Sequence, residues 1–62
     1  MTLKECKENI GKRVTYIPFK NCDKSLYERG IIKSVNSKYA FVLYDTTFGT
    51  KATNPKNLTL CV

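Results

Sequence analysis

The sequence predicts a mainly β domain in which a short N-terminal helix precedes five short strands that form a closed or partly open barrel. The first observation is the segment from Tyr27 to Asp45, where two runs rich in β-branched and aromatic residues flank a turn at residues 36–38. The second is the recurrence of Gly and Pro turn residues between short apolar runs. A chain of 62 residues has room for one domain with one small core.

Residues 3–10 are predicted to form the helix. Thr2 and Glu5 have the spacing of a capping box, in which each residue satisfies a backbone N–H of the other. Two helical turns are unstable alone, so we expect Leu3 and Ile10 to pack against the barrel, with the helix as a lid over one open end. A helix that binds a partner is the alternative.

The first two strands are predicted at residues 12–19 and 26–35. Both contain β-branched and aromatic residues typical of strands. Ile32 and Val35 are three residues apart, which breaks the alternation of a regular strand. We therefore expect a β-bulge or a sharp bend near Lys33.

The other three strands are predicted at residues 39–45, 50–53 and 58–62. Gly49 supplies the positive φ that a hairpin loop of four or five residues commonly requires. Pro55 favours a tight turn of 3₁₀ type before the last strand.

The second and third strands are expected to build most of the core. The residues predicted to lie inside are Ile32, Val35, Ala40 and Val42. Neither face of the third strand is polar, so both faces need a cover or one is an adhesive surface. We expect the helix to cover some of Tyr39, Phe41 and Leu43.

The charge of the chain favours contact with a polyanion. Eleven Lys and Arg residues stand against five Asp and Glu residues, a formal net charge of +6. Cations interleave with Tyr16 and Tyr27 in a way that suits phosphate contact and base stacking. The candidate nucleic-acid-binding residues are Lys12, Arg13, Lys20, Lys24, Arg29, Lys33 and Lys38. The same pattern also fits solvated outer faces of short strands, where Lys prevents edge pairing.

A protein-interaction module is the alternative function. Its candidate contact residues are Phe41, Leu43 and Phe48, together with the helix. A homodimer that buries these residues would give the same apolar surface a structural explanation.

Catalysis, metal binding and disulfides are not expected. The chain has three Cys, no CxxC pair and no His, so it lacks the usual zinc ligand sets and a general base for a thiol nucleophile. An odd number of Cys favours a reducing compartment. Cys6 and Cys61 are expected to be buried, whereas Cys22, between lysines in a polar loop, is the thiol expected to be exposed. The protein is predicted to be non-enzymatic and to need no cofactor.

The N-terminal segment lacks the apolar core of a signal peptide, and no apolar run approaches the ~18 residues that a membrane span requires. The expectation is a soluble, cytoplasmic protein without membrane contact.

Residues 11–62 resemble the SH3-like small barrels, in particular the KOW and Tudor branches. The matching motifs are Gly11-Lys12-Arg13-Val14, then Gly30-Ile31-Ile32-Lys33-Ser34-Val35, then the aromatic-rich Tyr39-Ala40-Phe41-Val42-Leu43-Tyr44-Asp45. The chain also resembles small proteins encoded by phages and prophages in its Lys51-Ala52-Thr53-Asn54-Pro55 segment. That second resemblance implies an origin in a phage or prophage, and so a bacterial host cytoplasm, but no activity. The alternative interaction module would then be an accessory protein that acts on a host or virion protein.

The resemblance implies two kinds of ligand. KOW-type barrels contact RNA or protein through loops and basic strand faces, which agrees with the candidate cations. Tudor domains bind methylated side chains in an aromatic cage through cation–π attraction. By position, Tyr27, Tyr44 and Phe48 would be the cage walls here, although ordinary packing of Tyr44 is the competing interpretation.

Overall fold

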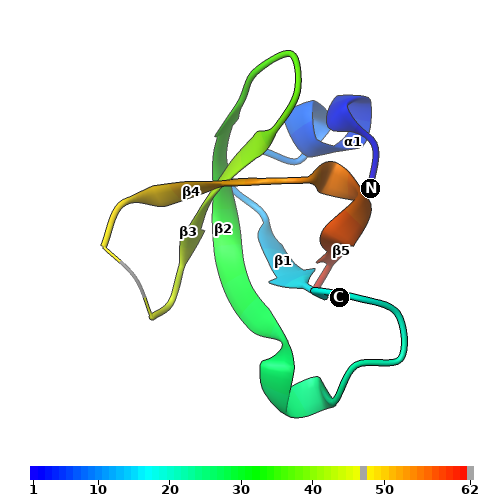
Figure 1. Ribbon diagram of the computed structural model, residues 1–62. Coiled ribbons are helices and arrows are strands. Elements are labelled where there is room, and N and C mark those ends of the chain that lie inside the picture. Colours follow the sequence, from blue (N-terminus) through cyan, green and yellow to red (C-terminus); the bar gives the residue numbers. More distant parts are fainter. Residues whose placement is uncertain (47, 62) are drawn as a thin grey trace.

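The computed structural model describes residues 1–46 and 48–61 as one antiparallel sheet with a short helix and two 3₁₀ turns (Figure 1). In chain order, the elements are α1 (Leu3–Glu8), β1 (Arg13–Tyr16), η1 (Lys24–Leu26), β2 (Glu28–Val35), β3 (Ala40–Tyr44), β4 (Thr50–Thr53), η2 (Pro55–Asn57) and β5 (Leu58–Leu60). The mainly β class, the N-terminal helix, the five strands and the 3₁₀ turn before the last strand are therefore confirmed.

The strands lie in the order β4-β3-β2-β1-β5, so the last strand pairs with the first. The long strand β2 curves through the middle of the sheet (Figure 1), and β4 and β5 form its two edges. Over the described residues the sheet is open, and the predicted barrel closure is not seen. The three-residue turn η2 connects the two edge strands, which remain unpaired with each other.

The predicted bulge in β2 is confirmed. The pairing of β2 with β3 shifts register between Ile32 and Ser34: Ile32 lies opposite Val42, whereas Ser34 lies opposite Phe41. The extra residue, Lys33, is exposed. A bulge of this kind bends the strand and increases its twist, which lets β2 wrap around the core.

The capping box of α1 is also confirmed. The Glu5 N–H donates to Thr2 Oγ1 at 3.1 Å, and the Thr2 N–H donates to Glu5 Oε1 at 2.9 Å. The Thr2 backbone N–H lowers the pKa of the Glu5 carboxyl most, and the Thr2 hydroxyl lowers it further. The helix ends at Glu8, earlier than predicted, because Asn9 caps it with a side-chain N–H donated to the Glu5 carbonyl at 2.7 Å.

The helix packs mainly through Cys6, whose burial was predicted, rather than through Leu3 and Ile10. Cys6 is fully buried in the core, whereas Leu3 is half-buried and Ile10 is 48% exposed. Ile10 lies beyond the end of the helix, so it does not share the buried face. The Met1 amino group donates to the carbonyls of Pro55 and Leu58 at 2.9 and 3.0 Å, which holds the start of the chain against η2 and β5.

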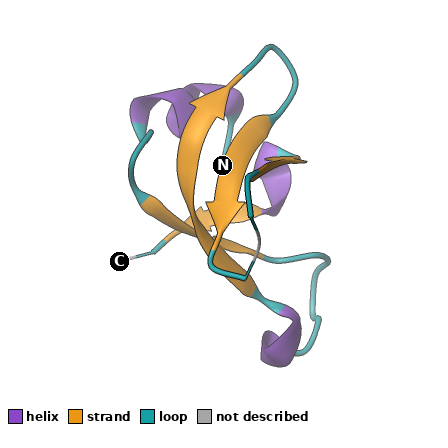
Figure 2. Cartoon of the chain, turned by 90° about the vertical axis from the view of Figure 1, so that its left-hand side faces the viewer, coloured by secondary structure: helices purple, strands orange, loops and turns teal. Residues whose placement is uncertain are grey.

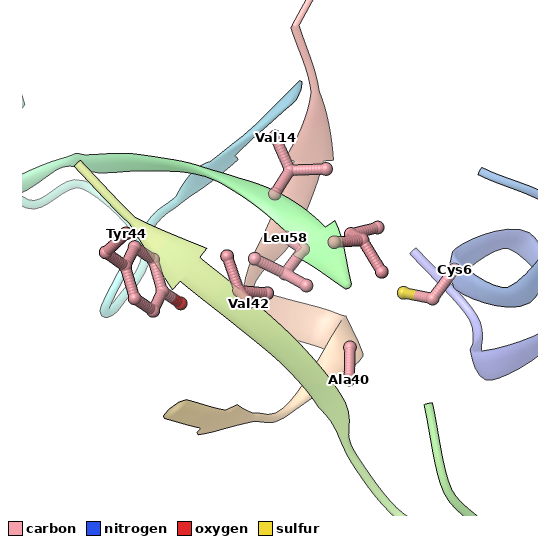
Figure 3. Packing of buried hydrophobic residues seen from close by; sticks show 7 residues of the cluster. Cys6, Val14, Ala40, Val42, Tyr44 and Leu58 are labelled. Carbon is pink, nitrogen blue, oxygen red and sulfur yellow. The ribbon is translucent and has the colours of Figure 1, made fainter. Parts of the chain in front are cut away.

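The core is one cluster on a single face of the sheet (Figure 3). Its buried members are Cys6, Val14, Ile32, Ala40, Val42, Tyr44 and Leu58. The predictions for Ile32, Ala40 and Val42 are confirmed, and Val35 is half-buried against the cluster. The Tyr44 hydroxyl lies 2.7 Å from Thr53 Oγ1, and its ring meets that of Tyr16 edge to face, with centroids 6.0 Å apart.

The prediction that the helix covers some of Tyr39, Phe41 and Leu43 is wrong. Phe41 and Leu43 alternate with the buried residues of β3, so they point to the sheet face away from Cys6 and α1. Both are half-buried, and Tyr39 is 43% exposed. We call this surface, remote from the core, the outer face.

Three strand boundaries differ from the prediction by two residues or more. β1 ends at Tyr16, three residues early, because the next residue donates its N–H to the Asn57 carbonyl at 2.8 Å and the chain leaves the sheet. β2 begins at Glu28 because the preceding segment forms the unpredicted turn η1. β5 is seen only to Leu60. Thr47, in the predicted hairpin loop, and Val62, the predicted end of the last strand, lie outside the described residues.

In the part of the chain that the structure describes, no helix has the length and apolar character needed to cross a bilayer.

Candidate functional site

An open groove with a volume of about 800 Å³ lies on the outer face, beside η1. β1 and β5 line one side of it with Thr15 and Thr59, and η1 and β2 line the other with Lys24, Tyr27 and Arg29. Ile17, Ser25, Glu28, Asp45 and Thr46 complete the lining. We call this site the η1 groove. It lies toward the end of the molecule away from α1 (Figures 1 and 2).

Local hydrogen bonds shape the η1 side of the groove. The Asp23 side chain caps the turn by accepting the Ser25 N–H at 3.0 Å. The Tyr27 N–H then donates to the Lys24 carbonyl at 3.1 Å, which ends the turn and leads directly into β2. Asn21, with φ of 63°, is in the left-handed region that Asn tolerates better than most residues. The loop thereby places Lys24 and Tyr27 beside Arg29.

Two acidic residues, Asp45 and Glu28, also line the groove, but Asp45 is paired with an arginine and Glu28 has its side chain toward the core face. Asp45 Oδ2 accepts from Arg13 Nη2 at 2.8 Å, so an arginine already neutralises this carboxylate. Glu28 lies opposite Tyr16 in the β1–β2 pairing, which directs its side chain toward the core face. The pKa of Tyr44 there is raised, chiefly by burial and to a smaller extent by the Glu28 charge. Lys24 and Arg29 therefore remain as exposed cations in the groove.

The structure brings together only part of the predicted basic surface. All seven candidate cations are exposed, but only Lys24 and Arg29 line the groove. Arg13 lies next to it through its ion pair with Asp45. Lys38 lies in the turn between β2 and β3, near α1 and at the other end of the molecule. Of the remaining candidates, Lys12 precedes β1, Lys20 lies in the β1–η1 loop and Lys33 occupies the β2 bulge.

The predicted aromatic cage is not formed. Tyr27 is half-buried in the η1 groove, Tyr44 belongs to the core on the other face of the sheet, and Phe48 is 107% exposed in the β3–β4 loop. Tyr16 also packs against the core, so it does not share a face with Arg13 as the interleaved pattern implied.

A second feature of the outer face is apolar. Phe41 pairs with Ala52 of β4, and Leu43 pairs with Ile31 of β2. We call these four residues the outer apolar patch. Phe41, Leu43 and Ile31 are half-buried, and Ala52 is exposed. The third predicted contact residue, Phe48, lies apart from the patch in the loop that follows β3.

Two cysteine predictions are wrong. Cys22 is 9% exposed and buried by the folded β1–η1 loop, whereas Cys61 is exposed on the outer face with its Sγ 3.0 Å from Thr15 Oγ1. Cys6 is buried as expected, and burial raises the pKa of its thiol. Among the described residues, no three His, Cys, Asp or Glu side chains gather where they could hold a metal ion.

Sequence reasoning missed the side of the groove formed by β1 and β5. Thr15 and Ile17 alternate with the core residues Val14 and Tyr16, and Thr59 follows the buried Leu58. Period-two alternation could therefore have assigned them to the outer face. Their meeting in one groove depends on the pairing of β5 with β1, which no local pattern indicates.

Comparison with known proteins gave no relative. No family model matches the chain, and neither the curated proteins nor the solved structures include a significant match.

Proposed function

We propose that this protein is a small non-enzymatic binding module that contacts nucleic acid through the η1 groove. The observation that carries the proposal is that Lys24 and Arg29 flank the half-buried Tyr27 in one open groove. Cations of this kind contact phosphates, and an accessible aromatic ring is a platform for a base. The threonine hydroxyls of β1 and β5 add hydrogen-bonding groups along the same groove.

The SH3-like kinship and the lack of catalysis are parts of the same proposal. The order in which β5 pairs with β1, with a 3₁₀ turn just before β5, supports an SH3-like ancestry of the KOW or Tudor type. The lack of His in the sequence supports a binding role without acid–base catalysis or cofactor. The resemblance to phage and prophage proteins supports a role in the cytoplasm of a bacterial host.

The test is a fluorescence-anisotropy titration with labelled single-stranded DNA, single-stranded RNA and duplex DNA across a series of salt concentrations. Lys24→Gln combined with Arg29→Gln removes both groove cations. Lys7→Gln combined with Lys51→Gln is the matched control, because it removes the same charge from α1 and β4.

The affinity of the wild-type protein should fall steeply with salt. The groove variant should bind more weakly and lose about 0.7–0.9 from the slope of log affinity against log salt for each phosphate contact removed. The control should keep that slope. Absence of binding to every oligonucleotide at low ionic strength would refute the proposal, and an equal loss in both variants would refute the assignment to this groove.

A protein-interaction function is the second candidate, and the full exposure of Phe48 favours it. In this alternative, Phe48 and the half-buried Phe41 and Leu43 contact a host or virion protein, or a second copy of the chain. A nuclease-resistant pull-down that recovers one stoichiometric partner, lost in Phe48→Ser, would support it. Sedimentation that shows a dimer in the wild type and a monomer in Phe48→Ser would favour the second copy.

A further inference from the structure

A second, smaller groove lies at the α1 end of the molecule, where the start of the chain meets η2 and the β2–β3 turn. Its volume is about 330 Å³, near the lower limit of common ligand pockets. Met1 and Leu3 are half-buried in its wall and Pro55 is buried at its base. Lys38 and Lys56 are exposed at its rim. We call it the η2 groove.

The chemistry of this groove differs from that of the η1 groove. Its exposed lining is mostly apolar, and none of the described residues that form it is aromatic, so these residues offer no platform for a base. Both charged side chains in the lining are lysines, and no Asp or Glu lies among the described residues that line it. Glu5, one helical turn away, is engaged by Thr2 in the capping box.

Hydrogen bonds from their own N–H groups fix the backbone at both lysines of the rim. The Lys38 N–H donates to Asn36 Oδ1 at 2.8 Å, and the Lys56 N–H donates to Asn54 Oδ1 at 3.0 Å. The Met1 amino group fixes the third side through its bonds to Pro55 and Leu58. A preformed groove of this kind loses little conformational entropy when a ligand binds.

We propose that the η2 groove docks an acidic peptide segment that carries a large apolar side chain. The apolar side chain fills the space between Leu3 and Pro55, and carboxylates on either side of it contact Lys38 and Lys56. The two lysines select an anionic ligand, and the apolar wall favours this peptide over a nucleic acid, which would leave that wall unused. The site is independent of the η1 groove, so the two proposals stand or fall separately.

The experiment is a titration of ¹⁵N-labelled protein, followed by amide chemical shifts, with a short capped peptide that places a leucine and a phenylalanine between glutamates. Two control peptides replace the glutamates by lysines or the apolar pair by serines. Lys38→Glu combined with Lys56→Glu reverses the charge of the rim. Lys7→Glu combined with Lys20→Glu makes the same change in net charge elsewhere.

We expect the acidic apolar peptide to shift amides of Thr2, Leu3, Lys38 and Lys56 and to bind about tenfold or more weakly to the rim variant, because two attractive charges become repulsive. The control variant should bind within about threefold of the wild type. The amide spectrum of each free variant reports directly whether it is folded.

Several outcomes overturn the proposal. These are equal binding of either control peptide, shifts that map to the η1 groove, an equal loss in both variants, and no shift up to about 1 mM peptide. Concentration-dependent shifts of the same amides without peptide would assign the groove to a second copy of the chain instead.

Discussion

Gly30 of β2 lies opposite Tyr44 of β3 with no space for a side chain, and its replacement by Ala tests the arrangement of the sheet. A Cβ atom at Gly30 would lie 2.5 Å from the Leu43 carbonyl oxygen, 2.8 Å from Val42 Cγ1 and 2.9 Å from Tyr44 Cα. Ordinary van der Waals contact begins at about 3.4 Å. Two of the three atoms belong to the backbone of β3, so the clash is relieved only if the two strands move apart.

Overpacking of this kind costs about 1–3 kcal/mol. A domain of 62 residues has a total free energy of unfolding of about 3–9 kcal/mol, so the loss is a large fraction of its stability. With about 4–8 °C lost per kcal/mol, the melting temperature of Gly30→Ala should fall by about 4–24 °C.

Thermal unfolding followed by circular dichroism measures this loss. Gly49→Ala measures backbone strain without a clash, because the added Cβ meets nothing within 4 Å and only the positive φ of 77° opposes it, at about 1–2 kcal/mol. If Gly30→Ala melts at or above the temperature of the wild type, the close approach of β2 and β3 is wrong.

Three further predictions concern the cap, the buried acids and the thiols. Thr2→Ala should lower the free energy of unfolding by about 0.5–2 kcal/mol in a denaturant titration, because the Glu5 N–H loses its partner, and an unchanged midpoint would argue against the cap. Burial raises the pKa of the Cys6 thiol and the Tyr44 phenol, so the native state keeps these protons to a higher pH than the unfolded chain does. Stability should therefore fall as the pH rises above about 9, and a flat profile to about pH 11 would contradict this assignment. In the native protein a thiol reagent should label Cys61 first and leave Cys22 protected until unfolding, and the reverse order would show that the β1–η1 loop is folded differently.

Local sequence signals were sufficient for the features that neighbouring residues decide. The Thr2–Glu5 spacing identified the helix start, the spacing of Ile32 and Val35 identified the bulge, and Pro55 identified the second 3₁₀ turn. In each case the interacting groups lie within a few residues of each other. Short-range sequence patterns are therefore enough to predict a helix cap, a bulge or a turn.

Contacts between distant residues decided most of the features that the sequence did not predict. Cys22 is in a polar stretch, and its burial depends on the conformation of the whole β1–η1 loop, which no local pattern predicts. Cys61 was misassigned for a different reason: period-two alternation from the buried Leu58 places it on the outer face. The end of β1 at Tyr16 follows from hydrogen bonds with Asn57, about forty residues further along the chain.

In the candidate site, too, local sequence predicted some features and contacts between distant residues decided the others. Lys24 and Arg29 were predicted from charge, but their selection from seven candidates required the groove that η1, β1 and β5 form together. Lys38, grouped with them by composition, lies in the η2 groove at the other end of the molecule. Sequence charge thus indicated a class of ligand, and the fold separated the cations into two sites of different chemistry.

The most direct test of the central claim is to map an unlabelled single-stranded oligonucleotide onto ¹⁵N-labelled protein by amide chemical shifts. Binding in the η1 groove predicts the largest shifts at Thr15, Lys24, Tyr27, Arg29 and Thr59, with their loss at high salt. Shifts confined to the η2 groove or spread evenly over all exposed lysines would contradict the claim that the η1 groove binds nucleic acid.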